Sequence, residues 1–296
     1  MTPPTLLFPA DPRGLDAPDP TFAPERDAAR AAGFDCRHFD GEALARGDAD
    51  RALRRLPREG GAVLHRGWMM PPARYAALHD ALAARAWAPL VSPAAYEQAH
   101  HLPRAYPLLG ALTAPTAWIE GADLDAAHAA ALSLGDGAVL VKDHVKSAKH
   151  RWEEACFIPD AADRAHFERV VRAFLDERGE RFERGLVFRK VLPLRLLRRD
   201  HRGMPVHEEH RMFFWRGELL LPEYYPEVRD EAERFRPVLA AAAAFESPFI
   251  SVDVARLEDG GVCVVEVGDG GVSGLPATLD EGEFFRALWE AMERAP

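Results

Sequence analysis

The lysines of this chain are few and lie in one stretch. The sequence contains 37 lysines and arginines, of which four are lysines, all between residues 142 and 190. Because arginine fills nearly every other basic position, we infer that lysine remains where its compact ammonium is needed. Lysine binds phosphate as a point charge, whereas arginine presents a planar fork. The segment AVLVKDHVKSAKH, with Lys142, Lys146 and Lys149, is therefore predicted to contact phosphate. The alternative is a chance cluster on a solvated loop.

A second group of residues that could do chemistry is acidic and lies in the stretch FISVDVARLEDGGVCVVEVGDGG. Asp253 and Glu266 each fall within an apolar run that predicts a strand, and Asp269 follows among glycines. Carboxylates rarely enter a strand core unless a cation or hydrogen bonds compensate them. Pairing of the two runs would bring Asp253 and Glu266 together. Magnesium binds one or two carboxylates together with substrate phosphates, so a magnesium site is predicted. The alternative is that both side chains alternate outward to solvent.

The elements that position these residues follow from hydrophobic periodicity. Apolar runs alternate with helical patterns over the first 90 residues, which indicates an α/β unit. A mainly helical region follows from 91 to 135, and a third segment covers 136–296. The expected strands are 5–8, 34–39, 61–65, 138–141, 185–192, 212–214, 218–221, 249–255 and 262–267. The expected helices are 24–32, 72–87, 161–176, 230–244 and 279–292.

Composition narrows the class of protein. A hydrophobic fraction of 48% and a charged fraction of 28% are typical of a globular domain. The formal net charge of -10 argues against nucleic-acid binding. Three widely spaced cysteines suggest neither a disulfide framework nor a zinc site. No apolar run reaches the length of a membrane span, and the N-terminus lacks a signal-peptide pattern. A cytoplasmic protein that does not bind membranes is therefore expected, with its oligomeric state undetermined.

Three catalytic motifs are ruled out by spacing. His207 and His210 in HEEHR stand three residues apart, which differs from the H-E-x-x-H of zinc proteases. The chain also has no G-x-x-x-x-G-K-[ST] phosphate loop and no G-x-S-x-G nucleophile motif. Any nucleotide site must therefore be built from other residues.

The remaining motifs together resemble the ATP-grasp superfamily. They are a lysine at a strand end, a lysine-containing loop, a Glu-x-Arg strand, a strand aspartate, and a strand glutamate followed by Gly-Asp-Gly. The match runs from about Gly137 to Pro276. RGWMM at Arg66–Met70 and AHHLP at Ala99–Pro103 are similar to motifs of a little-characterised branch. The resemblance implies an α/β (α+β) ATP-grasp fold with an N-terminal α/β pre-grasp domain.

The resemblance also implies roles for individual residues. Lys142 corresponds to the α-phosphate contact. Lys146, Ser147 and Lys149 correspond to the loop over the phosphates, and Lys149 is also a candidate catalytic residue. The cofactor candidates are completed by Glu209, Arg189 and Lys190, the last two on the strand LVFRKVLPL.

Arg211 corresponds to the catalytic arginine, which faces the transferring phosphoryl group and the substrate. Asp253, Glu266 and Asp269 correspond to the magnesium ligands, with Asp269 replacing the usual Asn. Arg66 and Ser273 are the other candidates for substrate binding. A surface salt bridge is the alternative for Arg66.

The family resemblance implies an ATP- and magnesium-dependent ligase. Such an enzyme activates a small-molecule or peptide carboxylate as an acyl phosphate, which an amine or similar nucleophile then attacks, with release of ADP and phosphate. Two alternatives remain open: a kinase-like phosphotransferase on the same fold, and a non-catalytic nucleotide-binding regulator.

Overall fold

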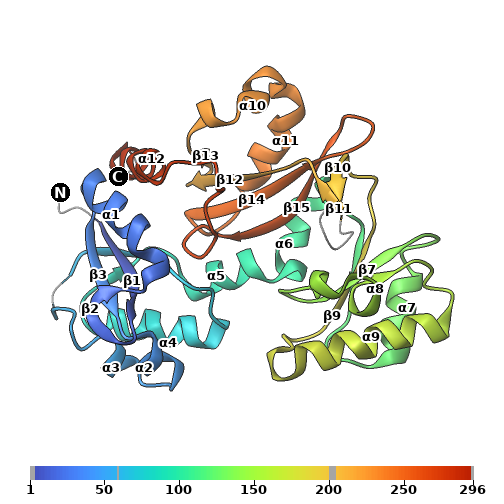
Figure 1. Cartoon of the computed structure of the whole chain (residues 1–296), viewed down its shortest axis with the longest axis horizontal. Coiled ribbons are helices and arrows are strands. Elements are labelled where there is room, and N and C mark those ends of the chain that lie inside the picture. Colours follow the sequence, from blue (N-terminus) through green and yellow to red (C-terminus); the bar gives the residue numbers. More distant parts are fainter. Residues whose placement is uncertain (1–3, 59, 200–204, 295–296) are drawn as a thin grey trace. The chain divides into compact units, whose positions relative to one another are not determined.

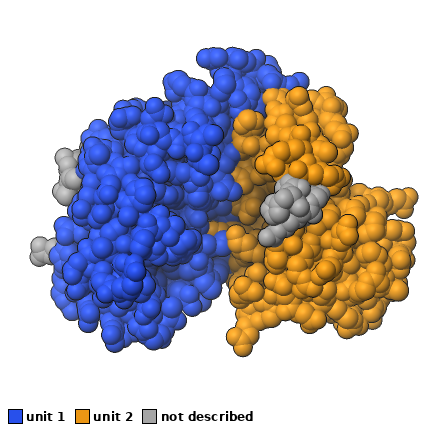
Figure 2. Space-filling view, in the orientation of Figure 1, with its two compact units in different colours: residues 1–99, 211–252, 268–296 blue, residues 100–210, 253–267 orange. Residues whose placement is uncertain are grey.

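The computed structural model describes residues 4–58, 60–199 and 205–294. The chain forms two compact units, each built from segments that are discontinuous in sequence (Figure 2). Unit 1 comprises residues 1–99, 211–252 and 268–296, and unit 2 comprises 100–210 and 253–267. The three contiguous domains expected from the sequence, 1–90, 91–135 and 136–296, stay a prediction.

The N-terminal part of unit 1 is a sheet with helices (Figure 1). In this sheet β3 and β4 both pair with β1 in parallel, β5 pairs with β4 in parallel, and β2 pairs with β1 antiparallel. The strands are β1 (Thr5–Asp11), β2 (Gly14–Pro18), β3 (Asp35–Phe39), β4 (Ala62–His65) and β5 (Ala88–Pro89). The helices of this part are α1 (Ala23–Ala32), α2 (Gly41–Ala45), α3 (Ala49–Ala52), α4 (Pro72–Ala83) and α5 (Pro93–His100).

Helix α1 shows how local sequence sets these boundaries. Gly33 follows α1 with a φ of 111°, a left-handed conformation in which the chain leaves the helix and enters β3. The last helix, α12 (Glu281–Arg294), belongs to the same unit and packs against α1. Trp289 of α12 meets Phe34 edge-on, with ring centroids 5.0 Å apart. The core of the N-terminal sheet is therefore completed by the C-terminal helix.

A second sheet has the strand order β13-β12-β14-β15 (Figure 1). Its strands are β12 (Glu209–Trp215), β13 (Glu218–Leu219), β14 (Phe249–Arg256) and β15 (Val262–Asp269). The division between the two units falls within β12, β14 and β15. Helices α10 (Pro226–Asp230) and α11 (Ala232–Ala242) lie between β13 and β14 in the chain. Phe213, Phe214 and Trp215 of β12 are buried.

Unit 2 contains an antiparallel sheet with the order β6-β9-β7-β8. Its strands are β6 (Thr116–Trp118), β7 (Val139–Asp143), β8 (Phe157–Ile158) and β9 (Leu186–Lys190), and a separate ribbon pairs β10 (Leu196–Arg199) with β11 (Pro205–His207). Its helices are α6 (Leu102–Leu109), α7 (Leu124–Leu132), α8 (Trp152–Ala155) and α9 (Arg164–Arg178). Phe167 and Phe174 of α9 pack with Val139 and Phe188 of the sheet in one apolar core.

Short 3-10 turns complete the described elements of the fold. They are η1 (Pro20–Phe22), η2 (Gly110–Leu112), η3 (Lys149–Arg151), η4 (Gly179–Arg181) and η5 (Pro222–Tyr224). Within the described residues, no helix has the length and apolar character that crossing a membrane requires.

Candidate functional site

The predicted lysine loop lines a pocket of about 250 Å³ in unit 2. The pocket lies beside the end of β7 and also receives Glu266 from β15. Its lining residues are Leu140, Val141, Lys142, Val145, Lys146, Ser147, Lys149, His150, Arg189, Val265 and Glu266. The fold therefore gathers all three lysines of the segment, Ser147 and one predicted metal ligand around one space, which we call the basic pocket.

Asp143, at the end of β7, fixes the shape of this loop. It is fully buried, and its Oδ1 accepts hydrogen bonds from the backbone N–H groups of Val145 at 2.8 Å and Lys146 at 2.6 Å. Its Oδ2 accepts a bond from Arg178 Nε at 2.8 Å. Because the carboxylate is held by both the loop and helix α9, it anchors the turn that carries the lysines. Asp143 was not among the predicted site residues.

Lys142 occupies the most desolvated position among the pocket lysines. Burial lowers the pKa of its ammonium to about 8, although the carboxylate of Glu266 opposes this effect. Within the part of the chain that the structure describes, the ammonium makes no hydrogen bond or ion pair. Removing a charge from water without a partner is costly. An anionic ligand in the pocket would compensate the charge, so the position fits a phosphate contact.

An apolar pocket of about 350 Å³ adjoins the basic pocket. The two share Leu140, Arg189 and Val265. The other lining residues of the apolar pocket are Ala114, Trp152, Lys190, Val191, Leu192, Pro193, Leu194, Leu196, Arg199, Pro205, His207, Glu258, Cys263 and Val264. An apolar space that continues into a cationic one matches a nucleotide, whose base is flat and apolar and whose phosphates are anionic.

Arg189 and Lys190 differ in which of the two pockets they line. Arg189 lines both and is held in place, since its guanidinium donates to Val265 O at 2.8 Å and Thr113 Oγ1 at 2.7 Å. Lys190 lines only the apolar pocket, and its ammonium bonds to the carbonyl oxygens of Gly135 and Asp136. Arg189 is therefore better placed than Lys190 to contact a ligand in both pockets.

The three predicted metal ligands belong to two different units. Asp253 is buried in β14, Glu266 is exposed in the neighbouring β15, and both belong to unit 2, whereas Asp269 belongs to unit 1. Across the described ranges, no three His, Cys, Asp or Glu side chains are grouped so that they could hold a metal ion. The oxygen donors of Asp253 and Glu266 suit magnesium only if phosphate oxygens and water complete its shell.

Asp269 is part of the interior of unit 1. It is 2% exposed, and its Oδ1 accepts a hydrogen bond from Gly271 N at 2.9 Å. Burial raises the pKa of this carboxyl to about 7, against the lowering effects of the Gly271 bond and of Arg66. Among the described residues, its buried Oδ2 accepts no hydrogen bond, so the carboxylate keeps one free oxygen and its metal role stays a prediction.

Arg66 is likewise buried, with 2% of its surface exposed. Its guanidinium donates to both carboxylate oxygens of Glu25, at 2.6 and 2.8 Å. It also donates to the carbonyl oxygens of Gly270 at 3.0 Å and Ser273 at 2.6 Å. These four bonds favour a structural role over substrate binding. The alternative, a surface salt bridge, is wrong, because the ion pair of Arg66 is buried.

The remaining predicted residues lie outside both pockets. Ser273 shares a 2.6 Å hydrogen bond with Ser251 and donates to Asp269 O at 2.9 Å. Arg211 donates to Gly274 O at 3.2 Å and, like Ser273, belongs to unit 1. Glu209 is exposed at the start of β12 in unit 2. Their roles stay predictions. Trp152 and His207 line the apolar pocket without having been predicted to do so.

Three-dimensional comparison identifies similar folds among solved structures. D-cycloserine synthetase DcsG is 17% identical, with a TM-score of 0.59 over 97% of this chain and 99% of that one. The ATP-grasp ligase PsnB, solved with minimal precursor, Mg and ADP, is 14% identical, with a TM-score of 0.57 over 99% and 98%. Macrocyclase MdnC from Microcystis aeruginosa, bound to precursor peptide MdnA, is 14% identical, with a TM-score of 0.54 over 99% and 100%.

The sequence comparisons point in the same direction. No curated protein matches the chain significantly. A family model for an ATP-grasp domain, family 3 of the R-two-K clade, matches residues 133–291, which contain the basic pocket and most of the apolar pocket. The mixed α/β fold, matched over nearly the whole length by ATP-grasp ligase structures, agrees with this assignment. The chain therefore belongs to the ATP-grasp superfamily, in family 3 of the R-two-K clade.

Proposed function

We propose that this protein is an ATP- and magnesium-dependent ligase that joins a carboxylate to an amine or a similar nucleophile through an acyl phosphate. The observation that carries the proposal is the pair of adjoining pockets in unit 2. The apolar pocket suits the adenine base, and the basic pocket suits the phosphates, with Arg189 lining both. The similar folds include the ATP-grasp ligase PsnB, solved with minimal precursor, Mg and ADP, and the macrocyclase MdnC, bound to a precursor peptide, which supports this choice.

In the proposed reaction, a carboxylate oxygen of the substrate attacks the γ-phosphorus of ATP. The bond to the bridging oxygen breaks, and ADP leaves. The nucleophilic nitrogen then attacks the acyl carbon, phosphate departs, and the nitrogen loses a proton. Phosphoryl transfer depends mainly on positioning and charge neutralisation. We assign the neutralisation to Lys142, Lys146 and Lys149, which line the basic pocket; the role of Arg211 stays a prediction.

Magnesium would be held by Glu266 and Asp253, together with phosphate oxygens. When bound, it neutralises charge on the phosphates and orients them. Glu266 lines the pocket that contains the lysines, so its carboxylate is available to a cation that accompanies the nucleotide. Binding of magnesium by Glu266 and Asp253 does not require Asp269, which lies in unit 1.

The test is a search for turnover with defined products. Purified protein, ATP and magnesium are incubated with amino acids and short peptides, with and without a second amine, and ADP release is followed. Phosphorus NMR then identifies the products. We expect ADP and phosphate, with release that depends on the amine. Products of AMP and pyrophosphate would contradict the acyl-phosphate route. A stable phosphorylated product would favour the kinase-like alternative, and absence of any turnover would favour the regulator.

A further inference from the structure

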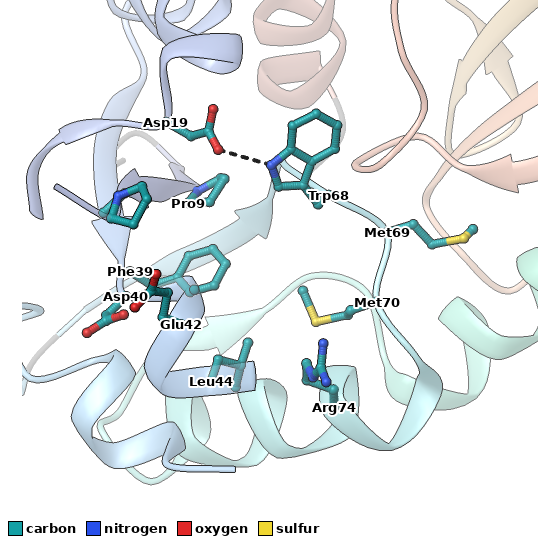
Figure 3. A pocket seen from close by; sticks show the side chains of 13 residues that line it. Pro9, Asp19, Phe39, Asp40, Glu42, Leu44, Trp68, Met69, Met70 and Arg74 are labelled. Atoms are coloured by element: carbon teal, nitrogen blue, oxygen red, sulfur yellow. Dashed lines mark hydrogen bonds between the residues drawn. The ribbon is translucent and has the colours of Figure 1, made fainter. Parts of the chain in front are cut away.

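A third pocket, of about 250 Å³, lies in unit 1 and shares no lining residue with the basic and apolar pockets (Figure 3). It sits where three parallel strands end. Residues of its lining come from the end of β1, from the segment after β3 and from the segment after β4. They are Pro9, Ala10, Pro12, Asp19, Phe39, Asp40, Gly41, Glu42, Leu44, Trp68, Met69, Met70 and Arg74. We call this space the strand-end pocket.

The strand order explains why a pocket forms at this place. The chain leaves β1 for β3 on one side and then passes to β4 on the other side of β1. The connections diverge at such a switch point, which leaves a crevice outside the carboxyl ends of the strands. Small ligands of open parallel sheets bind in crevices of this kind. The position of the pocket is therefore that of a ligand site.

The wall formed by residues 67–70 is fixed in place before any ligand arrives. Gly67 N donates to Gly271 O at 2.9 Å, and a Cβ at Gly67 would lie 2.7 Å from Pro9 Cδ, so the backbone passes too close for another residue. At the other end, Met70 N donates to the hydroxyl of Tyr96, which in turn donates to Met70 O, both at 3.0 Å. A preformed wall lowers the entropy cost of binding.

Trp68 is the prominent apolar side chain of this wall. Its side chain is 54% exposed, although it packs edge-on against Phe22, with ring centroids 4.9 Å apart. Its indole Nε1 donates to Asp19 Oδ2 at 3.2 Å. Figure 3 shows Trp68, Phe39 and Met70 around a common space. Exposed tryptophan at the rim of a preformed pocket provides a surface for the apolar part of a ligand.

The charges of the pocket favour a cation. Three carboxylates line it, those of Asp19, Asp40 and Glu42, against the single guanidinium of Arg74. Burial alone would raise the pKa of Asp19, but hydrogen bonds from Thr21 and Trp68 lower it overall, so this carboxylate is ionised at neutral pH.

Asp40 and Glu42, the two other carboxylates of the lining, can still bind a cation. Among the described residues, Asp40 caps helix α2 through Oδ1 alone, by accepting from Ala43 N at 2.9 Å. Glu42 pairs with Arg46 at 3.3 Å, where both side chains are exposed and the attraction is weak. With aromatic walls and excess negative charge, the pocket suits an ammonium group attached to an apolar body.

We propose that the strand-end pocket binds a small primary amine with an apolar body, whose ammonium lies against Asp40 and Asp19 while its apolar part packs on Trp68 and Met70. The proposal does not depend on ligase activity, because it concerns binding to unit 1 in the absence of nucleotide. It adds a ligand site to a part of the chain that the family match at residues 133–291 does not include.

Binding is tested on the full chain without ATP, by calorimetry and by NMR of the Trp68 indole, with Trp68→Phe used to assign that resonance. Three probes of one shape separate the chemistries: phenethylamine, 2-phenylethanol and 3-phenylpropanoate. We expect saturable binding of the amine, a shift of the Trp68 resonance, and weaker or no binding of the other two. Tighter binding of the acid would overturn the proposal, as would equal binding of the alcohol, or amine binding without a shift at Trp68.

Matched variants then test the charge. Asp40→Asn removes the charge and keeps the helix cap, since Asn caps as well as Asp; we expect amine affinity to fall by about tenfold. Asp48→Asn is the control, because Asp48 caps α3 through the same contact and lies outside the pocket lining. Arg74→Gln should raise affinity by removing repulsion. Equal effects of the two Asn variants, or weaker binding in Arg74→Gln, would contradict the assignment.

Discussion

Both carboxylate oxygens of Glu25 accept hydrogen bonds from the Arg66 guanidinium, at 2.6 and 2.8 Å, although the two residues are 41 positions apart in sequence. The pair joins helix α1 to the end of β4, and the same guanidinium holds the loop at Gly270 and Ser273. Three segments of unit 1 that are far apart in sequence therefore meet at one side chain.

Loss of Glu25 should be costly for stability. Glu25→Gln leaves Arg66 with a buried charge that is only partly compensated, and such changes typically cost about 3–5 kcal/mol. We expect the free energy of unfolding in urea to fall accordingly. Glu233→Gln is the control, since Glu233 pairs with Arg236 at 2.7 Å where both side chains are largely exposed. A similar small effect in both variants would show that the buried pair does not hold unit 1 together.

Asp269 should make stability depend on pH. Its folded-state pKa of about 7 lies above its ordinary value of 3.8, so the folded chain keeps a proton that the unfolded chain releases. The contribution of Asp269 to the free energy of unfolding is therefore full below about pH 4. It is lost as pH rises through 7, by up to about 4 kcal/mol. Asp269→Asn, which keeps the acceptor for Gly271 N, should gain stability over wild type as pH rises from 4 to 8.

The control for Asp269 is Asp259→Asn. Asp259 makes the same local bond, to Gly261 N at 2.8 Å, in an exposed turn. Urea unfolding at several pH values compares the two. A stability difference between Asp269→Asn and wild type that stays constant with pH would mean that Asp269 does not titrate in this range.

Lys142 should take up a proton when ATP binds. The pKa of its ammonium is about 8 in the free protein, and nearby phosphates would raise it. At pH 8.5, calorimetry in buffers of different ionisation enthalpy should therefore show net proton uptake, and ATP affinity should fall as pH rises through 8. Lys142→Ala should abolish the uptake and weaken ATP binding by about tenfold to a hundredfold. Arg172→Ala, on the exposed face of α9, should change neither. Uptake that persists in Lys142→Ala would assign the proton elsewhere.

Glu266 should act in opposite directions with and without magnesium. Without the metal its carboxylate repels phosphates in the basic pocket, so Glu266→Gln should bind metal-free ATP more tightly than wild type. With magnesium the variant should lose the gain in affinity that the metal gives wild type, and turnover should fall. Titrations with and without magnesium measure both effects. If magnesium strengthens ATP binding equally in the two proteins, Glu266 does not hold the ion.

The local parts of this structure could be predicted because their signals are local. Strand β7, which carries Lys142, strands β12 and β13, and helix α1 all follow from periodicity. The gathering of Lys142, Lys146 and Lys149 around one pocket also follows, because they share one strand end and one loop.

Contacts between residues far apart in the chain could not be predicted from the sequence. A buried arginine and a surface arginine look alike in a linear pattern, so the bonds of Arg66 to Glu25 and Gly270 could not be foreseen. Asp269 was predicted as a metal ligand with Asp253 and Glu266 from the family resemblance, and its burial in the interior of unit 1 could not be foreseen from that pattern. Helix 72–87 was expected to be longer than α4, which ends at Ala83. Ala86, with a φ of 61°, then turns the chain toward β5.

The packing of α12 on α1 has a consequence for how the protein is made. Phe284, Phe285 and Leu288 belong to the same core as Leu6, Phe8 and Phe34. A ribosome synthesises the first strands long before it reaches α12. Until then, part of the apolar face of the N-terminal sheet is exposed to solvent. A premature stop codon before residue 281 would yield a chain that quality-control proteases recognise.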